Sequence, residues 1–127
     1  CNILIAEDNP LNRKILGAVL QKCNMKYTET ADGDEVVETF KQAPEGTFDC
    51  ILMDMRMPKL DGIKATAQIR ALPKGDAATI PIIGVSANGF EDDIKKAKLA
   101  GVNAYTPKPI DRNRLMSLMK DLIKKGL

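Results

Sequence analysis

The chain reads Ile51-Leu-Met-Asp-Met-Arg-Met-Pro-Lys-Leu-Asp-Gly62 around its middle. An apolar run from Cys50 to Met53 ends at the carboxylate of Asp54, and Pro58 and Gly62 then mark a loop, because proline fixes its backbone angle and glycine tolerates conformations that other residues avoid. A short apolar run closed by turn residues is typical of a buried strand in a parallel sheet. Since open α/β sheets bind ligands beyond the carboxyl ends of their strands, Asp54 is the first candidate functional residue.

Length and composition indicate one globular domain, which we expect to span residues 1–127. A content of 44% hydrophobic and 28% charged residues is enough for a hydrophobic core under a polar surface. The net charge of +2 is too small to suggest nucleic-acid binding. The local basic cluster at Lys95, Lys96 and Lys98 is more typical of a solvated helix face.

The cysteine and histidine counts exclude several kinds of site. Three cysteines without metal-ligand spacing argue against a disulfide framework and for a reducing compartment. Cys50 falls inside the predicted strand, so we expect it to be a small buried hydrophobe. The chain contains 0 histidines, which excludes histidine-based catalysis and histidine metal ligands.

No apolar run approaches the about 20 residues that a membrane span requires. We therefore expect a cytoplasmic location without membrane contact by this domain, either alone or as the cytoplasmic part of a membrane-bound protein. The chain begins at Cys1 and enters a predicted strand almost at once, which suggests a segment of a longer protein.

Hydrophobic patterning predicts strands that alternate with helices along the chain. The strands are expected at residues 3–6, 26–30, 48–53, 80–85 and 104–106, and helices at about 34–42, 63–72 and 91–100. A further helix follows Asn9 and Pro10, residues suited to a helix start, and a last helix closes the chain. The apolar residues at near-helical spacing in these two helices are Leu11, Ile15, Leu16, Val19 and Leu20, and Leu115, Leu118, Met119, Leu122 and Ile123.

Such alternation with short connections predicts an α/β fold: a doubly wound, five-stranded parallel sheet between two helix layers, in a three-layer α/β/α arrangement. We expect the flavodoxin-like strand order 2-1-3-4-5. In that order the direction of winding reverses between the first and third strands. The resulting crevice lies where Glu7, Asp8 and Asp54 leave the sheet.

The predicted strand ends bring a chemically coherent set of residues to this crevice: Glu7 and Asp8 from the first strand, Asp54 from the third, Ser86 from the fourth and Lys108 from the fifth. Three converging carboxylates repel one another unless a divalent cation neutralises them. Ligation by oxygen alone favours Mg²⁺, with Mn²⁺ as the alternative. The Lys108 ammonium and the Ser86 hydroxyl would then hold further oxygens of a phosphoryl group.

The chain resembles the receiver domain of two-component response regulators from end to end. The motifs that carry the resemblance are the acidic pair after the first strand, Asp54 with Met57-Pro58 and Asp61-Gly62, Ser86-Ala87, and Lys108-Pro109. Each motif alone is weak, but all of them in order, each at a strand's carboxyl end, are highly specific. The string Ala6-Glu-Asp-Asn-Pro-Leu-Asn-Arg13 is most similar to receivers built into hybrid sensor histidine kinases.

The resemblance implies that Asp54 accepts a phosphoryl group from a phosphohistidine of a histidine kinase or a histidine phosphotransfer domain. It also implies that Asp8, Asp54 and the backbone carbonyl of Arg56 bind Mg²⁺, with Glu7 acting through a coordinated water.

In receiver domains a further group of residues responds to the phosphoryl group. By resemblance, Ser86 bonds to it, Lys108 pairs with its oxygens and Tyr105 changes its packing together with Ser86. Asp54, Ser86 and Lys108 are thus the expected catalytic residues, because a receiver catalyses its own phosphorylation and dephosphorylation. The altered surface is expected to be read by an output domain or a downstream protein, in a phosphorelay that includes a larger hybrid histidine kinase.

A doubly wound sheet is also compatible with three other functions. A phosphorylation-independent interaction module usually lacks one of the key residues, and none is missing here. A haloacid-dehalogenase-type phosphatase also uses a magnesium-bound aspartate, but it needs a second Asp where this chain has Arg56. A flavodoxin-like binder of flavin mononucleotide would carry a Ser/Thr/Gly-rich loop after the first strand, where this chain has Glu7 and Asp8.

Overall fold

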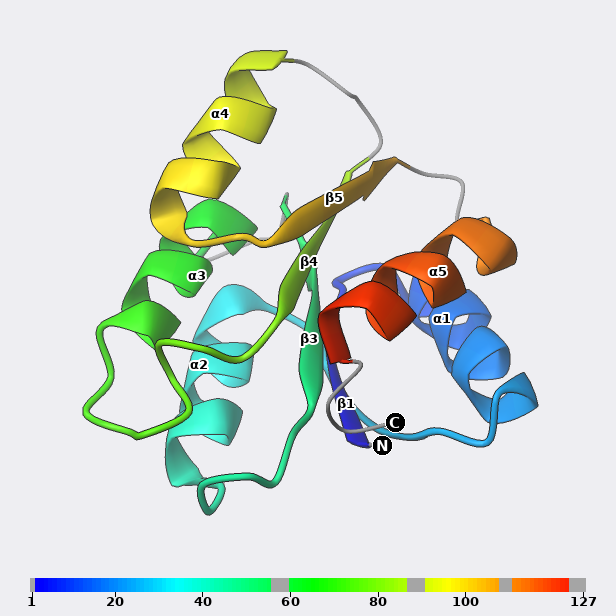
Figure 1. Cartoon of the computed structure of the whole chain (residues 1–127), viewed down its shortest axis with the longest axis horizontal. Helices are drawn as coiled ribbons and strands as arrows, with labels where there is room; N and C mark the ends of the chain where they lie inside the picture. The colour runs from blue at the N-terminus through cyan, green and yellow to red at the C-terminus, as the bar shows by residue number, and fades with distance from the viewer. Residues whose placement is uncertain (1, 56–59, 87–90, 108–110, 124–127) are drawn as a thin grey trace.

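Apolar runs form strands and amphipathic segments form helices in strict alternation along the chain (Figure 1). The computed structural model describes residues 2–55, 60–86, 91–107 and 111–123, without the side chains of 86, 91–94 and 107. The strands are β1 (Asn2–Ala6), β2 (Lys26–Thr30), β3 (Cys50–Asp54), β4 (Ile82–Ser86) and β5 (Ala104–Pro107). The helices are α1 (Pro10–Lys22), α2 (Gly33–Gln42), α3 (Gly62–Arg70), α4 (Glu91–Ala100) and α5 (Arg112–Ile123).

All five strands belong to one sheet in the order β2-β1-β3-β4-β5, and every neighbouring pair is parallel. Helices α1 and α5 cover one face of the sheet, and α2, α3 and α4 cover the other (Figure 1). The predicted fold class and strand order are therefore confirmed. The direction of winding reverses between β1 and β3, so the carboxyl ends of these two strands are where such a sheet is expected to bind its ligand.

The hydrophobic core lies in two layers, one on each face of the sheet. Successive residues of β3 alternate between them, with Cys50 and Leu52 on the side of α1 and α5, and Ile51 and Met53 on the side of α2, α3 and α4. All four of these side chains are completely buried. This two-sided burial explains why the strand reads as a continuous apolar run.

Several strand boundaries differ from those predicted by one or two residues, most at the starts of β3 and β4. The strand β4 begins at Ile82 rather than at residue 80, because Pro81 has no N–H to donate to a neighbouring strand. The carbonyl oxygen of Pro81 still accepts a hydrogen bond from the amide of Ile51 at 2.9 Å. The strand β3 begins at Cys50 and includes Asp54. Phe48 precedes that strand and is buried beside the ring of Phe40, with the ring centroids 6.4 Å apart.

The apolar residues of α1 do not all face the sheet. Leu16 and Leu20 are buried, whereas Leu11 is 65% and Ile15 43% exposed. The exposed pair is spaced four residues apart, so the two side chains are neighbours on one side of the helix. The chain thus presents an apolar surface on α1 that helical spacing alone did not reveal.

The structure also places the cysteine and the lysines that the composition singled out. Cys50 is buried as predicted, and this burial raises the pKa of its thiol to about 12. Lys95, Lys96 and Lys98 are exposed on α4. Among the residues that the structure describes, no helix is long and apolar enough to cross a membrane.

Candidate functional site

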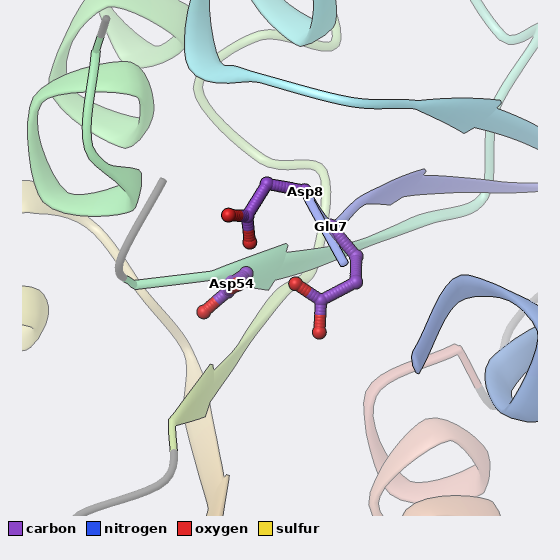
Figure 2. Close-up of side chains that lie close together, drawn as sticks. All are labelled: Glu7, Asp8 and Asp54. Atoms are coloured by element: carbon purple, nitrogen blue, oxygen red, sulfur yellow. The ribbon is translucent and has the colours of Figure 1, made fainter. Parts of the chain in front are cut away.

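Carboxylates from β1 and β3 meet at the carboxyl edge of the sheet. Asp54 is the last residue of β3 and is 3% exposed, Glu7 directly follows β1 and is 0% exposed, and Asp8 is exposed. One carboxylate oxygen from each of the three lies within 4.8 Å of those of the other two. Figure 2 shows the side chains converging on the space beside the end of β3.

The pairing of β1 with β3 places the two buried carboxylates side by side. Ala6 lies opposite Met53 in the parallel register, so Glu7 and Asp54 are the next residues of the two strands. The backbone hydrogen bonds between strands continue past the strand ends. The amide of Glu7 donates to the carbonyl oxygen of Thr30 at 3.1 Å, and the amide of Met55, which follows Asp54, donates to the carbonyl oxygen of Val85 at 2.9 Å. Neighbouring strands on either side therefore fix the backbone that carries these carboxylates.

The start of α3 packs directly against the end of β3. The amide of Gly62 donates to the carbonyl of Met55 at 3.1 Å, and the Asp61 carboxylate caps α3 by accepting from the amide of Lys64 at 2.8 Å. A Cβ atom at Gly62 would collide with the carbonyl oxygen of Asp54 and with Met55. Only glycine therefore lets the helix approach the strand end this closely.

The loop between β1 and α1 is held by two polar side chains. The side-chain oxygen of Asn9 caps the helix, as predicted, by accepting from the amides of Leu11 at 2.9 Å and Asn12 at 3.3 Å. Arg13 donates from Nη1 to the carbonyl oxygens of Glu7 at 2.8 Å and Asp8 at 3.2 Å. Sequence reasoning assigned no role to Arg13; its one signal is a cation in the first turn after an acidic pair.

The donor set of this cluster consists of carboxylate oxygens alone. Oxygen ligands suit Mg²⁺, Mn²⁺ or Ca²⁺ and disfavour metals that prefer sulfur or imidazole. Placing like charges this close costs electrostatic free energy, which a bound divalent cation would remove. The side chains therefore fit the kind of metal site that their residue types predicted.

The other predicted site residues are only partly described. Ser86 ends β4, the strand next to β3, but its side chain lies outside the described part of the structure. Tyr105 is half-buried in β5 and packs against the core layer of α2, α3 and α4. Arg56 and Lys108 lie outside the described residues, so the structure does not test their roles.

Comparison with known proteins assigns the family. A sequence profile of the response regulator receiver domain matches residues 3–120. The chain belongs to this family. It is a receiver domain of two-component phosphorelay signalling, as the motifs at its strand ends predicted.

Several relatives of this receiver are histidine kinases. The chain is 38% identical over 118 residues to the signal transduction histidine-protein kinase BarA of Escherichia coli K12, a match that covers 92% of this chain and 12% of the kinase. The first three curated relatives are all histidine kinases, and the match spans only 7% to 12% of their length.

Two solved structures share both fold and sequence with the chain. The receiver domain of sensor histidine kinase PA1611 from Pseudomonas aeruginosa PAO1, described with a magnesium ion in its active-site cleft, superposes with a TM-score of 0.87 at 36% identity, covering 97% of each chain. The receiver domain of Ssk1 from Saccharomyces cerevisiae was solved in complex with the histidine phosphotransfer protein Ypd1. It superposes with a TM-score of 0.85 at 31% identity, and the match covers 98% of this chain and 90% of the Ssk1 chain.

The contact between Gly62 and the strand end can be tested by Gly62→Ala. We expect the substitution to lower the free energy of unfolding by about 3 kcal/mol, because the added methyl group meets fixed backbone atoms. Gly17→Ala is the matched control, since Gly17 is also helical and its added Cβ would meet the movable Tyr27 hydroxyl at 2.8 Å. Urea denaturation measures the free energy of unfolding of both variants. Equal values for Gly62→Ala and Gly17→Ala would contradict the assigned contact.

Proposed function

We propose that this domain accepts one phosphoryl group on Asp54 from a phosphohistidine, in a reaction that depends on Mg²⁺. The observation that carries the proposal is the convergence of the Glu7, Asp8 and Asp54 carboxylates within 4.8 Å at the end of β3, in a chain of the receiver family. Asp54 is the proposed phosphoacceptor because it is the last residue of β3, the middle strand of the sheet, and because it stands at the position of the family's phosphoacceptor motif.

The proposed cation ligands are Asp8, Asp54 and the backbone carbonyl of Arg56, with Glu7 acting through a coordinated water. The magnesium ion described in the related PA1611 receiver supports this choice of metal. Mn²⁺ suits the same oxygen donors. When bound, the cation neutralises the carboxylates and the oxygens of the incoming phosphoryl group.

The proposed chemistry is an in-line phosphoryl transfer. A carboxylate oxygen of Asp54 forms a bond to phosphorus while the bond from phosphorus to the imidazole nitrogen breaks. The electron pair of that bond stays on the nitrogen, and a donor histidine whose other ring nitrogen carries a proton leaves as neutral imidazole. Lys108 pairs with the phosphoryl oxygens, and the Ser86 hydroxyl donates a hydrogen bond to one of them. Attack of water on phosphorus later releases phosphate and restores the Asp54 carboxylate.

Phosphorylation is tested with acetyl phosphate and Mg²⁺, followed by intact mass. We expect the mass of one phosphoryl group to be added to the wild type. Asp54→Asn should abolish the addition because the amide is not a nucleophile, and EDTA should abolish it because it removes the cation on which the proposed transfer depends.

A mass addition that survives Asp54→Asn or EDTA would contradict the proposal. A folded wild type that takes up no phosphoryl group would favour the phosphorylation-independent interaction module. Steady turnover of a phosphate monoester would favour the aspartyl phosphatase.

The phosphodonor is proposed to be a histidine phosphotransfer domain or a histidine kinase that docks over α1. Leu11 and Ile15 are exposed on this helix, which starts three residues after Glu7, so an apolar surface lies beside the crevice. The complex of the related Ssk1 receiver with a histidine phosphotransfer protein supports a donor of this class. Burying such side chains at an interface contributes to affinity.

This docking surface can be separated from the chemistry by the choice of donor. We expect the double variant Leu11→Ala, Ile15→Ala to slow transfer from a phosphorylated histidine phosphotransfer domain about tenfold or more, since the loss of buried apolar area weakens the complex. Phosphorylation by acetyl phosphate should stay unchanged, because a small donor needs no docking. Leu99→Ala, at an 89% exposed leucine of α4, is the control; equal slowing in the control would contradict docking on α1.

The wider protein is proposed to be a hybrid histidine kinase, because the first curated relatives are histidine kinases many times longer than this chain. We place the domain in the cytoplasm, where phosphohistidine donors are formed.

The proposed output surface consists of α4, β5 and α5. Ser86 ends β4, and β5, which pairs with β4, carries the half-buried Tyr105. A phosphoryl group biases a two-state element only through contacts that differ between the two states. The hydrogen bond from Ser86 would be such a contact, and movement of Tyr105 would carry the change to the surface that an output domain or downstream protein reads.

Amide chemical shifts measured with Mg²⁺ and beryllofluoride test this output surface. We expect shifts from residue 86 through residue 106 in the wild type. Ser86→Ala lacks the hydroxyl that would bond to the phosphoryl group. This variant should therefore lose the shifts in α4 and β5 while keeping those of the crevice loops. Ser86→Thr should restore them. Shifts confined to the crevice loops in the wild type would contradict the proposal.

A further inference from the structure

The guanidinium of Arg13 lies against the backbone of the acidic pair. Its Nη1 donates to the carbonyl oxygen of Glu7 at 2.8 Å and to that of Asp8 at 3.2 Å. The side chain is only 20% exposed, so it points inward from α1 rather than into solvent. Arginine is suited to this position because its planar fork of N–H donors keeps its charge at all relevant pH values.

Asp8 depends on its backbone for orientation more than the other two carboxylates do. It is exposed and lies in the loop between β1 and α1, whereas Glu7 and Asp54 are buried at strand ends. On one side of Asp8 the last strand hydrogen bond is made by the amide of Glu7, and on the other side Asn9 caps the helix. Between these two anchors, Nη1 of Arg13 donates to the carbonyl oxygen of Asp8 itself.

We propose that Arg13 is a positioning residue for the cation site: it holds the Glu7–Asp8 backbone so that the Asp8 carboxylate faces Asp54 before the metal arrives. The inference rests on the proposed function, because it concerns the same Mg²⁺ site. Residues that orient metal ligands without touching the metal typically change metal affinity by 10- to 100-fold when replaced.

Glu29 contributes little to this arrangement. Its carboxylate lies 3.7 Å from Nε of Arg13, but it is 43% exposed. Ion pairs this accessible to water are weak. The two hydrogen bonds to backbone carbonyls, rather than the ion pair, therefore define the role of Arg13.

Positioning and simple electrostatics predict opposite effects of removing Arg13. A positive charge near a cation site repels Mg²⁺, so on electrostatic grounds Arg13→Gln should tighten binding and Arg13→Lys should leave it unchanged. If Arg13 positions Asp8, both variants should weaken binding, since neither glutamine nor lysine presents the guanidinium fork to two carbonyls. The direction of the change thus distinguishes the two roles.

The experiment is a Mg²⁺ titration of the wild type, Arg13→Gln and Arg13→Lys, followed by the amide chemical shifts of the crevice residues. We expect the dissociation constant to rise about tenfold in both variants. Glu29→Gln should stay within about twofold of the wild type, because its ion pair is weak.

Arg70→Gln is the matched control. Arg70 is also partly buried and donates to the carbonyls of Ala77 and Gly101 and to the side chain of Asn103, with no contact to the acidic cluster. Its replacement should lower the melting temperature but leave the Mg²⁺ dissociation constant within about twofold. Melting curves of the Mg²⁺-free proteins show how much stability each variant loses.

Each outcome decides between the two roles. Weaker Mg²⁺ binding in both Arg13 variants but not in Arg70→Gln supports positioning. Unchanged or tighter binding in Arg13→Lys overturns it, as does equal weakening in Arg70→Gln, which would mark a general loss of stability. If Arg13→Gln does not fold, Arg13→Lys decides alone. A wild type that does not bind Mg²⁺ would instead overturn the proposed function.

Discussion

The parallel pairing of β1 with β3 is the constraint on which the rest of the site depends. With Ala6 opposite Met53, the next residues of the two strands are both carboxylates, Glu7 and Asp54. Mutual repulsion favours moving them apart, but the strands beneath them are buried from Ile3 to Ala6 and from Cys50 to Met53, and they are hydrogen-bonded to further strands on either side. The hydrophobic core therefore holds the like charges together, and a bound divalent cation would lower their electrostatic energy.

The parts of this arrangement that sequence predicts are those set by the sheet. The end of an apolar run locates Asp54, and the winding rule for alternating strands and helices places it beside Glu7, because β1 and β3 must be neighbours in the order 2-1-3-4-5. Strand boundaries are less certain, since they depend on which backbone groups find partners. Pro81 shows this: the apolar run continues through it, but the strand starts only after it.

The parts that sequence does not predict depend on the rotation of a helix about its axis. The apolar residues of α1 lie on two different sides of the helix. Their spacing in the sequence does not predict which side packs on the sheet, and in the structure Leu16 is buried while Leu11 is exposed. The contacts of Arg13 depend on the same rotation and on the chain reversal at Asn9. For Arg56 and Lys108, which lie outside the described residues, the roles implied by the family remain predictions.

Helix α1 therefore contributes to the site from two opposite sides. Its inner side carries Arg13, which contacts the backbone of the acidic pair, while its outer side carries Leu11 and Ile15. These three residues lie within little more than one turn, and an α-helix is stiff over that length. A donor docked on the outer side, as proposed, would be held at a fixed distance from the carboxylates whose backbone Arg13 contacts. The proposed docking and the proposed ligand orientation would then share one structural element, and the proposed transfer to Asp54 would need no rearrangement of the sheet.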